Sequence, residues 1–137
     1  MREYKFRGQD VNGKFVFGNL HVDKNAHDTS KNLYYIIRQG FVPTLTMPAA
    51  NYIEVKPETV GQYTGLIDEK GIEVFENDII ECYGEDNEVI LVAEVQFQEG
   101  GFCVQIDYDL HLIPLDAFGS AYKVIGNIHE HPHLATK

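Results

Sequence analysis

The stretch that decides the fold is VILVAEVQFQEGGFCVQIDYDL, residues 89–110. Its first half alternates apolar and polar side chains, which is the period of a strand with one buried face. Glu99-Gly100-Gly101 then supplies residues suited to a tight turn, and the same period resumes after it. The stretch therefore predicts a β-hairpin with these apolar side chains on its inner face: Val89, Leu91, Ala93, Val95, Phe97, Phe102, Val104, Ile106, Tyr108 and Leu110.

Segments of the same kind lie on both sides of this hairpin. Each is rich in aromatic and β-branched residues and is bounded by Gly, Pro, Asn or Asp. A helical period is not sustained anywhere, and residues 23–32 are uniformly polar, which predicts a mobile loop. The sequence predicts an all-β fold of short antiparallel strands and hairpins, with further strands at 4–7, 15–22, 33–38, 52–56, 72–75, 78–83 and 122–128, and helical turns after Pro57 and at 114–119.

Charge divides the chain into two parts. Residues 1–57 carry eight Lys and Arg against five acids, whereas residues 58–116 carry fifteen acids against one lysine. Such an asymmetry predicts two units of different character. We therefore expect a basic N-terminal β subdomain over 1–57, packed against an acidic subdomain over 58–137. Because surface ion pairs contribute under about 1 kcal/mol each, apolar burial must supply most of that contact.

Composition also bears on location. The longest apolar runs fall far short of the roughly 20 residues of a membrane-spanning helix, and the first residues alternate charged and aromatic side chains. We expect a cytoplasmic protein without membrane association. Cys82 and Cys103 have no CxxC partner, so they are expected to be reduced thiols that fill space near a sheet; a disulfide between them is the alternative.

Two groups of side chains have the character of metal ligands. His129, His131 and His133 alternate and would share a face in a continuing strand, although Pro132 within the run favours a flexible tail. Asp107, Asp109 and His111 alternate in the same way, with Gln105 on the same side. The opposite side of that strand is apolar, so a solvated outer face explains the pattern equally well. We expect no physiological metal site at either place.

The sequence has no recognisable catalytic arrangement. Ser30 and Ser120 lie outside any GxSxG turn, and the chain contains neither a GxxxxGK[ST] nor a GxGxxG phosphate loop. Neither cysteine belongs to a motif typical of a nucleophile. We therefore expect a protein that is not an enzyme, with no catalytic residue and no cofactor.

Three motifs together resemble the YopX family of phage and prophage proteins. They are REYKFR at residues 2–7, VGQYTGLIDEKGIEVFENDII at 60–80, and VIGNI at 124–128. Asn77 stands where the family usually has glycine, and the chain lacks the family's early tryptophan. The resemblance implies a phage origin and a C-terminal part similar to an SH3-type barrel, but it supplies no reaction or ligand. In the central motif, Gly61 and Gly65 favour a tight bend and Asp78 is suited to capping a turn, which predicts a structural role.

These observations favour an interaction protein whose partner is another protein or a second copy of the chain. The alternative is a nucleic-acid-related regulator, with the acids of residues 58–116 imitating the charge of a duplex. Direct binding of nucleic acid is not expected, because such an acidic surface repels phosphates. A direct binder would have to use these basic and aromatic residues: Arg2, Lys5, Arg7, Lys14 and Arg38 with Tyr4, Phe6 and Phe15.

Overall fold

Strands and short 3-10 turns make up the regular structure of the chain in a computed structural model that describes residues 3–38, 51–106, 111–119 and 121–136. The predicted all-β class is confirmed: all strand pairs are antiparallel, and they form two sheets. Contacts divide the chain into two compact units, residues 1–62 and 63–137. The predicted boundary after residue 57 stays a prediction. Within the described ranges, no helix is long and apolar enough to cross a membrane.

The first unit opens with the hairpin expected from the sequence. Strand β1 (Phe6–Gln9) pairs with β2 (Phe15–Asp23), and Gln9 lies opposite Phe15. The connecting turn is built by Asp10, whose Oδ1 accepts hydrogen bonds from the amides of Asn12 (2.8 Å) and Lys14 (3.0 Å). Gly13 takes a φ of +80°, a conformation in which glycine lacks the steric penalty of other residues.

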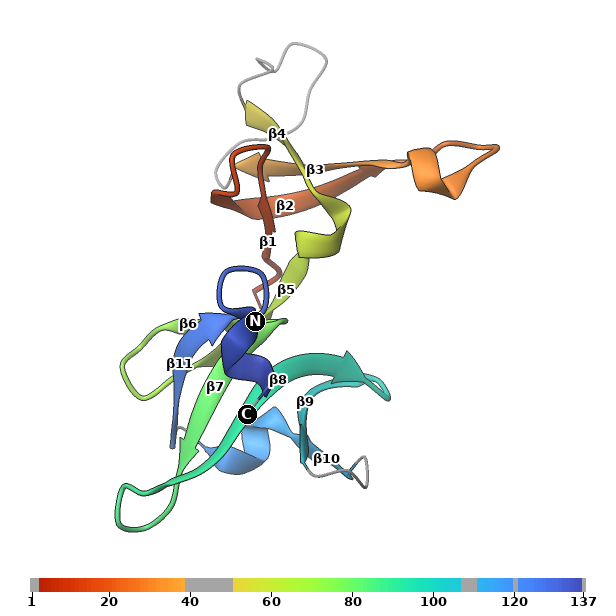
Figure 1. The fold of residues 1–137 in the computed structure, drawn as a ribbon. Helices are drawn as coiled ribbons and strands as arrows, with labels where there is room; N and C mark the ends of the chain where they lie inside the picture. Colours follow the sequence, from red (N-terminus) through yellow and green to blue (C-terminus); the bar gives the residue numbers. More distant parts are fainter. Residues whose placement is uncertain (1–2, 39–50, 107–110, 120, 137) are drawn as a thin grey trace. The chain divides into compact units, whose positions relative to one another are not determined.

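Strands β2, β3 (Leu33–Arg38) and β4 (Tyr52–Val55) extend this sheet in sequence order. The polar segment between β2 and β3 is a loop, as predicted, and its own side chains form a turn at the tip of the hairpin (Figure 1, orange), whereas its mobility stays a prediction. Asp28 accepts hydrogen bonds from the amide and hydroxyl of Ser30 and caps the 3-10 helix η1 (Thr29–Lys31). Local Asp and Asn hydrogen bonds thus order residues that no apolar contact covers.

The end of β4 returns to β1 and forms the core of the first unit. The amide of Lys56 donates to the carbonyl of Gln9 (2.9 Å), and the Gln9 amide donates to Thr59 Oγ1 (2.8 Å) in η3 (Pro57–Thr59). This approach brings Val55 against Gly8, where an added Cβ would lie 2.9 Å from two Val55 carbons. Ile36 and Ile37 are both buried, so β3 is covered on both faces.

Strand β5 (Gly61–Ile67) belongs to both units. Gly61 and Gln62 pair with β1 in the first unit, and Tyr63 and Ile67 pair with β6 (Glu73–Phe75) in the second. Thr64 Oγ1 donates to the Val74 carbonyl (2.8 Å), and the ring of Tyr63 lies 5.5 Å from that of Phe75. The central sequence motif therefore forms a twisted two-stranded arm.

Five strands form the main sheet of the second unit. Four follow one another as a meander, and the last returns to pair with the first, which gives the order β10-β9-β8-β7-β11 (Figure 1). The two edges, β10 and β11, are not joined in the residues described, so the SH3-type barrel implied by the resemblance stays a prediction. The bounds are β7 (Asp78–Tyr83), β8 (Val89–Gln98), β9 (Gly101–Ile106), β10 (His111–Pro114) and β11 (Tyr122–Asn127), with 3-10 helices η4 (Leu115–Phe118) and η5 (Pro132–Thr136).

The deciding hairpin forms with the predicted alternation, but its ends leave the core. The turn is Glu99-Gly100, both with positive φ, and Gln98 pairs with Gly101. Val89 and Phe97, predicted to be buried, are 50% and 52% exposed, because the long β8 extends past the layer it covers at both ends. Tyr108 and Leu110 lie outside the described residues. The buried cluster of this unit consists of Val74, Ile80, Cys82, Ala93, Val95, Val104, Leu115 and Tyr122.

Candidate functional site

Asp68 lies in the turn between β5 and β6 and connects that turn to β11 through three backbone amides. Its side chain is 2% exposed; Oδ1 accepts from the amides of Lys70 (2.8 Å) and Ile72 (2.9 Å), and Oδ2 accepts from the amide of Val124 (3.0 Å) in β11. Burial by itself would raise the pKa of Asp68, but these three hydrogen bonds outweigh burial and lower it. Asp68 is therefore a structural anion, held by backbone donors.

Asp78 has a similar role at the next turn. Its Oδ2 accepts from the Phe75 amide (2.8 Å), which is the capping expected from the sequence. The preceding Asn77 takes a φ of +73°, a conformation that Asn adopts more readily than most residues, and its Nδ2 donates to Glu94 (3.0 Å). The two buried aspartates of the central motif, residues 60–80, thus accept hydrogen bonds from backbone amides, and these bonds stabilise its turns.

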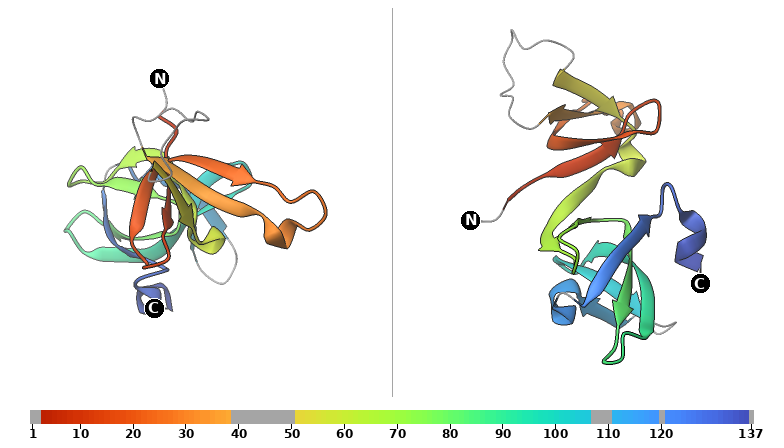
Figure 2. Two further views of the ribbon diagram at one scale, coloured as in Figure 1. Left: turned by 90° about the horizontal axis from the view of Figure 1, so that it is seen from above. Right: turned by 90° about the vertical axis from the view of Figure 1, so that its left-hand side faces the viewer.

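The histidine-rich tail is a turn followed by a 3-10 helix. Asn127 ends β11, and its Oδ1 accepts from the amides of His129 (3.0 Å) and Glu130 (2.9 Å). His131 returns toward the strand, where its Nδ1 lies 2.6 Å from the position that a Cβ at Gly126 would take. Figure 2 shows η5 beyond β11 at the C-terminal end (right, blue). A continuing strand is absent from the described residues after Asn127, because Asn127 turns the chain before Pro132 is reached, and the flexibility of the tail stays a prediction.

The structure describes only part of the two sets of possible metal ligands. His129, His131 and His133 follow a turn, so they do not share a strand face. Asp107 and Asp109 lie outside the described residues, and His111 pairs with Ile106 from the next strand, β10. His111 therefore lies on a strand antiparallel to β9, and its predicted grouping with Asp107 and Asp109 stays a prediction. Within the described ranges, no three His, Cys, Asp or Glu side chains are grouped to hold a metal.

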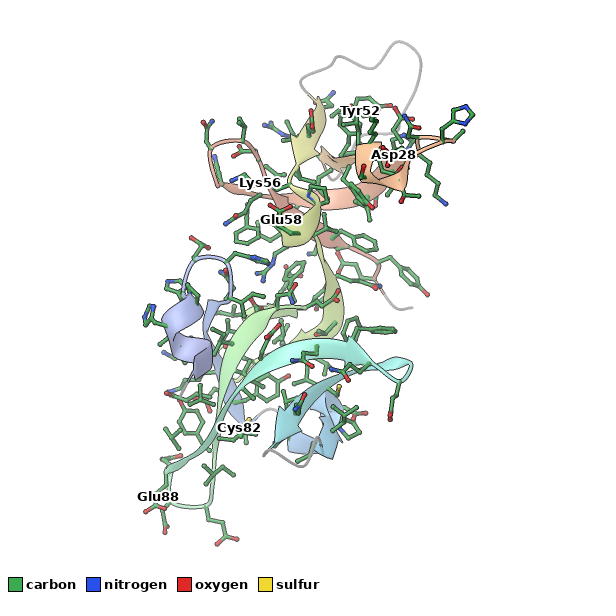
Figure 3. The ribbon with its side chains drawn as sticks, turned by 45° about the vertical axis from the view of Figure 1, so that its right-hand side comes forward. Asp28, Tyr52, Lys56, Glu58, Cys82 and Glu88 are labelled. Atoms are coloured by element: carbon green, nitrogen blue, oxygen red, sulfur yellow. The ribbon has the colours of Figure 1, made fainter. Side chains whose placement is uncertain are left out.

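Both cysteines are free and buried in the second unit. Cys82 lies in β7, inside the core cluster, as Figure 3 shows. Burial raises the pKa of its thiol to about 11. The thiolate is the reactive form of cysteine, and the raised pKa keeps Cys82 a neutral thiol near neutral pH. Cys82 therefore has the properties of a space-filling residue, as predicted.

The basic residues that a nucleic acid would need are divided between surface and interior. Lys5 is 9% and Arg7 is 7% exposed. Lys5 forms an ion pair with Glu3 (3.4 Å), and the guanidinium of Arg7 lies 4.6 Å from the centre of the Phe15 ring. Lys14 and Arg38 are exposed, and Arg2 lies outside the described residues.

A groove of about 300 Å³ opens on the second unit. It is lined by Thr64, Leu66, Gly101, Phe102, Pro114, Leu115 and Asp116, and we call it the second-unit groove. Leu66 and Phe102 also pack against the buried core, so the groove is an opening at the edge of that core. The half-exposed Phe97 lies beside it, with its ring centre 5.1 Å from that of Phe102 in an edge-to-face arrangement.

Sequence reasoning missed the second-unit groove. Its lining comes from β5, the start of β9 and the β10–η4 connection, which are far apart in the chain. A signal in the sequence was the number of apolar side chains in the β8–β9 hairpin, which is larger than the core can cover. The alternating pattern alone assigns all of them to the inner face.

A second, wider groove of about 560 Å³ lies on the first unit. Asp10 and Val11 of the β1–β2 turn line it together with the run from Tyr52 to Pro57. Figure 3 labels Tyr52 and Lys56 at two places along this run. Its lining adjoins in sequence the segment 39–50, which is outside the described residues, so the second-unit groove is the better defined candidate.

Comparisons with known proteins agree with this geometry. The YopX protein family matches residues 5–135. Protein EF1440 from Enterococcus faecalis has a similar structure, with 26% identity, a TM-score of 0.57 and coverage of 98% of this chain and 99% of that one. Protein yopX from Bacillus subtilis shares the fold at 18% identity and a TM-score of 0.54, covering 95% and 96% of the two chains. Among curated proteins, none matches. The chain belongs to the YopX family.

Proposed function

We propose that this chain is a phage-derived protein-interaction module without enzymatic activity, and that the second unit contacts the partner. The observation that carries the proposal is the second-unit groove with its exposed aromatic neighbour Phe97. Aromatic side chains beside an apolar depression are typical of protein contact surfaces, since they bury much area at low entropic cost.

The state of the polar groups supports a role without catalysis. A catalytic centre usually holds acids or nucleophiles whose pKa is tuned toward the working pH. Here the two buried carboxylates, Asp68 and Asp78, accept hydrogen bonds from backbone amides, and the pKa of Cys82 is moved away from neutrality. These groups stabilise turns and fill the core.

Direct binding to nucleic acid has weaker support. Phosphate contacts need exposed cations, and Lys5 and Arg7 are buried. Imitation of a nucleic acid duplex would require exposed carboxylates. Asp68 and Asp78 do not meet this requirement, because they are buried and accept hydrogen bonds from backbone amides. We expect no salt-sensitive shift of DNA or RNA in a gel at micromolar protein and physiological salt.

Site-specific photocrosslinking tests the proposal. A benzoylphenylalanine placed at Phe97 should crosslink one discrete protein in the cells that naturally produce the chain. The matched control carries the same group at Glu88, which is exposed in the turn between β7 and β8 (Figure 3). Equal crosslinking at positions 97 and 88, or none at either, would contradict an interaction surface at the second-unit groove.

A further inference from the structure

The walls of the second-unit groove are apolar, and they offer a ligand few polar contacts. Leu66, Phe102 and Pro114 supply hydrocarbon surface, and the buried Leu115 closes the groove beneath them. The hydroxyl of Thr64 is already used inside the protein: it donates to the Val74 carbonyl and accepts from the Leu66 amide (3.2 Å). A cavity of ~150 Å³ accommodates one benzene. The groove volume of about 300 Å³ therefore suits one or two apolar side chains.

The charged residue that lines the groove is an acid, and the second unit as a whole carries a net negative charge. Asp116, exposed in the first turn of η4, lines the groove, and its lining residues include no Lys, Arg or His. Residues 63–137 carry fifteen acids and three lysines, a net charge of −12 before histidine is counted. Such a field attracts cations and repels phosphorylated or carboxylate ligands over about a Debye length.

From these two properties we infer that the second-unit groove binds an extended peptide segment in which apolar residues are flanked by Lys or Arg. This inference rests on the proposed function and names the class of partner. The apolar side chains enter between Leu66, Phe102 and Pro114, against the edge formed by the Phe97 ring. The cationic side chains lie over Asp116, within the net negative field of the second unit. Affinity then comes from apolar burial, and charge supplies selectivity and rate.

An NMR titration of the full chain tests the inference. The probe is the synthetic peptide acetyl-GSLPKRLPKRSG-amide, added to ¹⁵N-labelled protein at low salt. The expected result is a saturable shift of the Leu66, Phe102, Leu115 and Asp116 amides. A peptide with Glu in place of every Lys and Arg, and one with Ser in place of every Leu and Pro, should each bind at least about tenfold more weakly.

Two charge-reversal variants distinguish binding in the second-unit groove from non-specific attraction by the net charge of the protein. Asp116→Lys should weaken binding of the probe by about three- to tenfold, because a rim contact becomes a repulsion. Glu88→Lys makes the same change of net charge in the β7–β8 turn, away from the lining residues, and should weaken binding less than about twofold. Both positions are exposed, and the spectrum of each variant reports directly whether it folds.

Three results would overturn the inference. They are an absence of binding, shifts confined to other residues, and equal weakening by Asp116→Lys and Glu88→Lys. The chemical shifts of the groove amides could also change with protein concentration when no peptide is present. That result would show that a second copy of the chain occupies the groove, and it would overturn the peptide assignment. In each case a discrete crosslink from position 97 would still uphold the proposed function, so the two can fail separately.

Discussion

Replacing Asp68 by Asn tests whether one buried carboxylate fastens the β5–β6 arm to the main sheet. An amide at this position has a single acceptor oxygen. If that oxygen keeps the amides of Lys70 and Ile72, the NH₂ group faces the Val124 amide at about the present 3.0 Å, donor against donor. The substitution therefore removes one hydrogen bond to a charged group and leaves a buried N–H unsatisfied.

The size of the effect follows from those contacts. A hydrogen bond to a charged group contributes about 1.5–3 kcal/mol, and an unsatisfied buried donor costs about 1–3 kcal/mol. These two contributions overlap, because both describe the same lost contact with the Val124 amide. Removing the buried charge also avoids its desolvation cost, which offsets part of the lost stability. We expect Asp68→Asn to lower the free energy of unfolding by about 2–4 kcal/mol at neutral pH, measured by urea denaturation. Asp86→Asn, in the exposed β7–β8 turn, is the control and should change stability by less than about 0.5 kcal/mol.

The pH dependence supplies a second check. The pKa of Asp68 is lowered in the folded state, so its stabilisation is complete above the unfolded pKa of about 3.9 and is lost as pH falls through the folded value. The difference in stability between parent and Asp68→Asn should therefore be constant from pH 7 to pH 5 and shrink below about pH 4. A loss under 1 kcal/mol at pH 7, or a difference that does not change with acid, would refute the reasoning.

Three further outcomes are expected. Gly8→Ala should destabilise the first unit by about 1–3 kcal/mol, because its Cβ would lie 2.9 Å from Val55 carbons; Val55→Ala in the same chain should recover part of the loss, and Gly101→Ala, which meets nothing within 4 Å, should be neutral. Cys82, with a raised pKa and no exposed surface, should resist alkylation by iodoacetamide at pH 8 until urea is added. Because Cys103 is a second free thiol, the labelled site is located by peptide mass spectrometry, and labelling of Cys82 in the native chain would disprove its burial. Val95→Ala, at a fully buried position, should cost about 1–3 kcal/mol in thermal or urea unfolding, whereas Phe97→Ala, at a half-exposed one, should cost less than about 1.5 kcal/mol; the reverse order would mean that the register of β8 is wrong.

Local chemistry explains why so many elements could be predicted. Asp10 and Gly13 build the first turn from hydrogen bonds and backbone freedom that depend only on neighbours in the chain. The alternation around Ala93 and Val95 identifies a buried face for the same reason, since the period of a strand is a property of its own residues.

Function was less accessible, because each candidate depended on where separate segments meet. The alternating Asp107, Asp109 and His111 gave no sign that His111 begins β10, which pairs antiparallel with β9, since both strands of such a pair have a period of two. Likewise, the histidine tail could not reveal that Asn127 bonds the following amides and ends the strand early.

The sequence by itself determined the all-β class, the positions of most strands, the family resemblance and the division of charge. These follow from spacing, turn residues and composition, which act over a few neighbours. Only the tertiary structure decided that Asp68 binds an amide 56 residues away, that Lys5 and Arg7 are buried, and that Phe97 remains half exposed beside a groove. The physical reason is that burial and long-range hydrogen bonds depend on which strands become neighbours and how far each extends past the layer it covers.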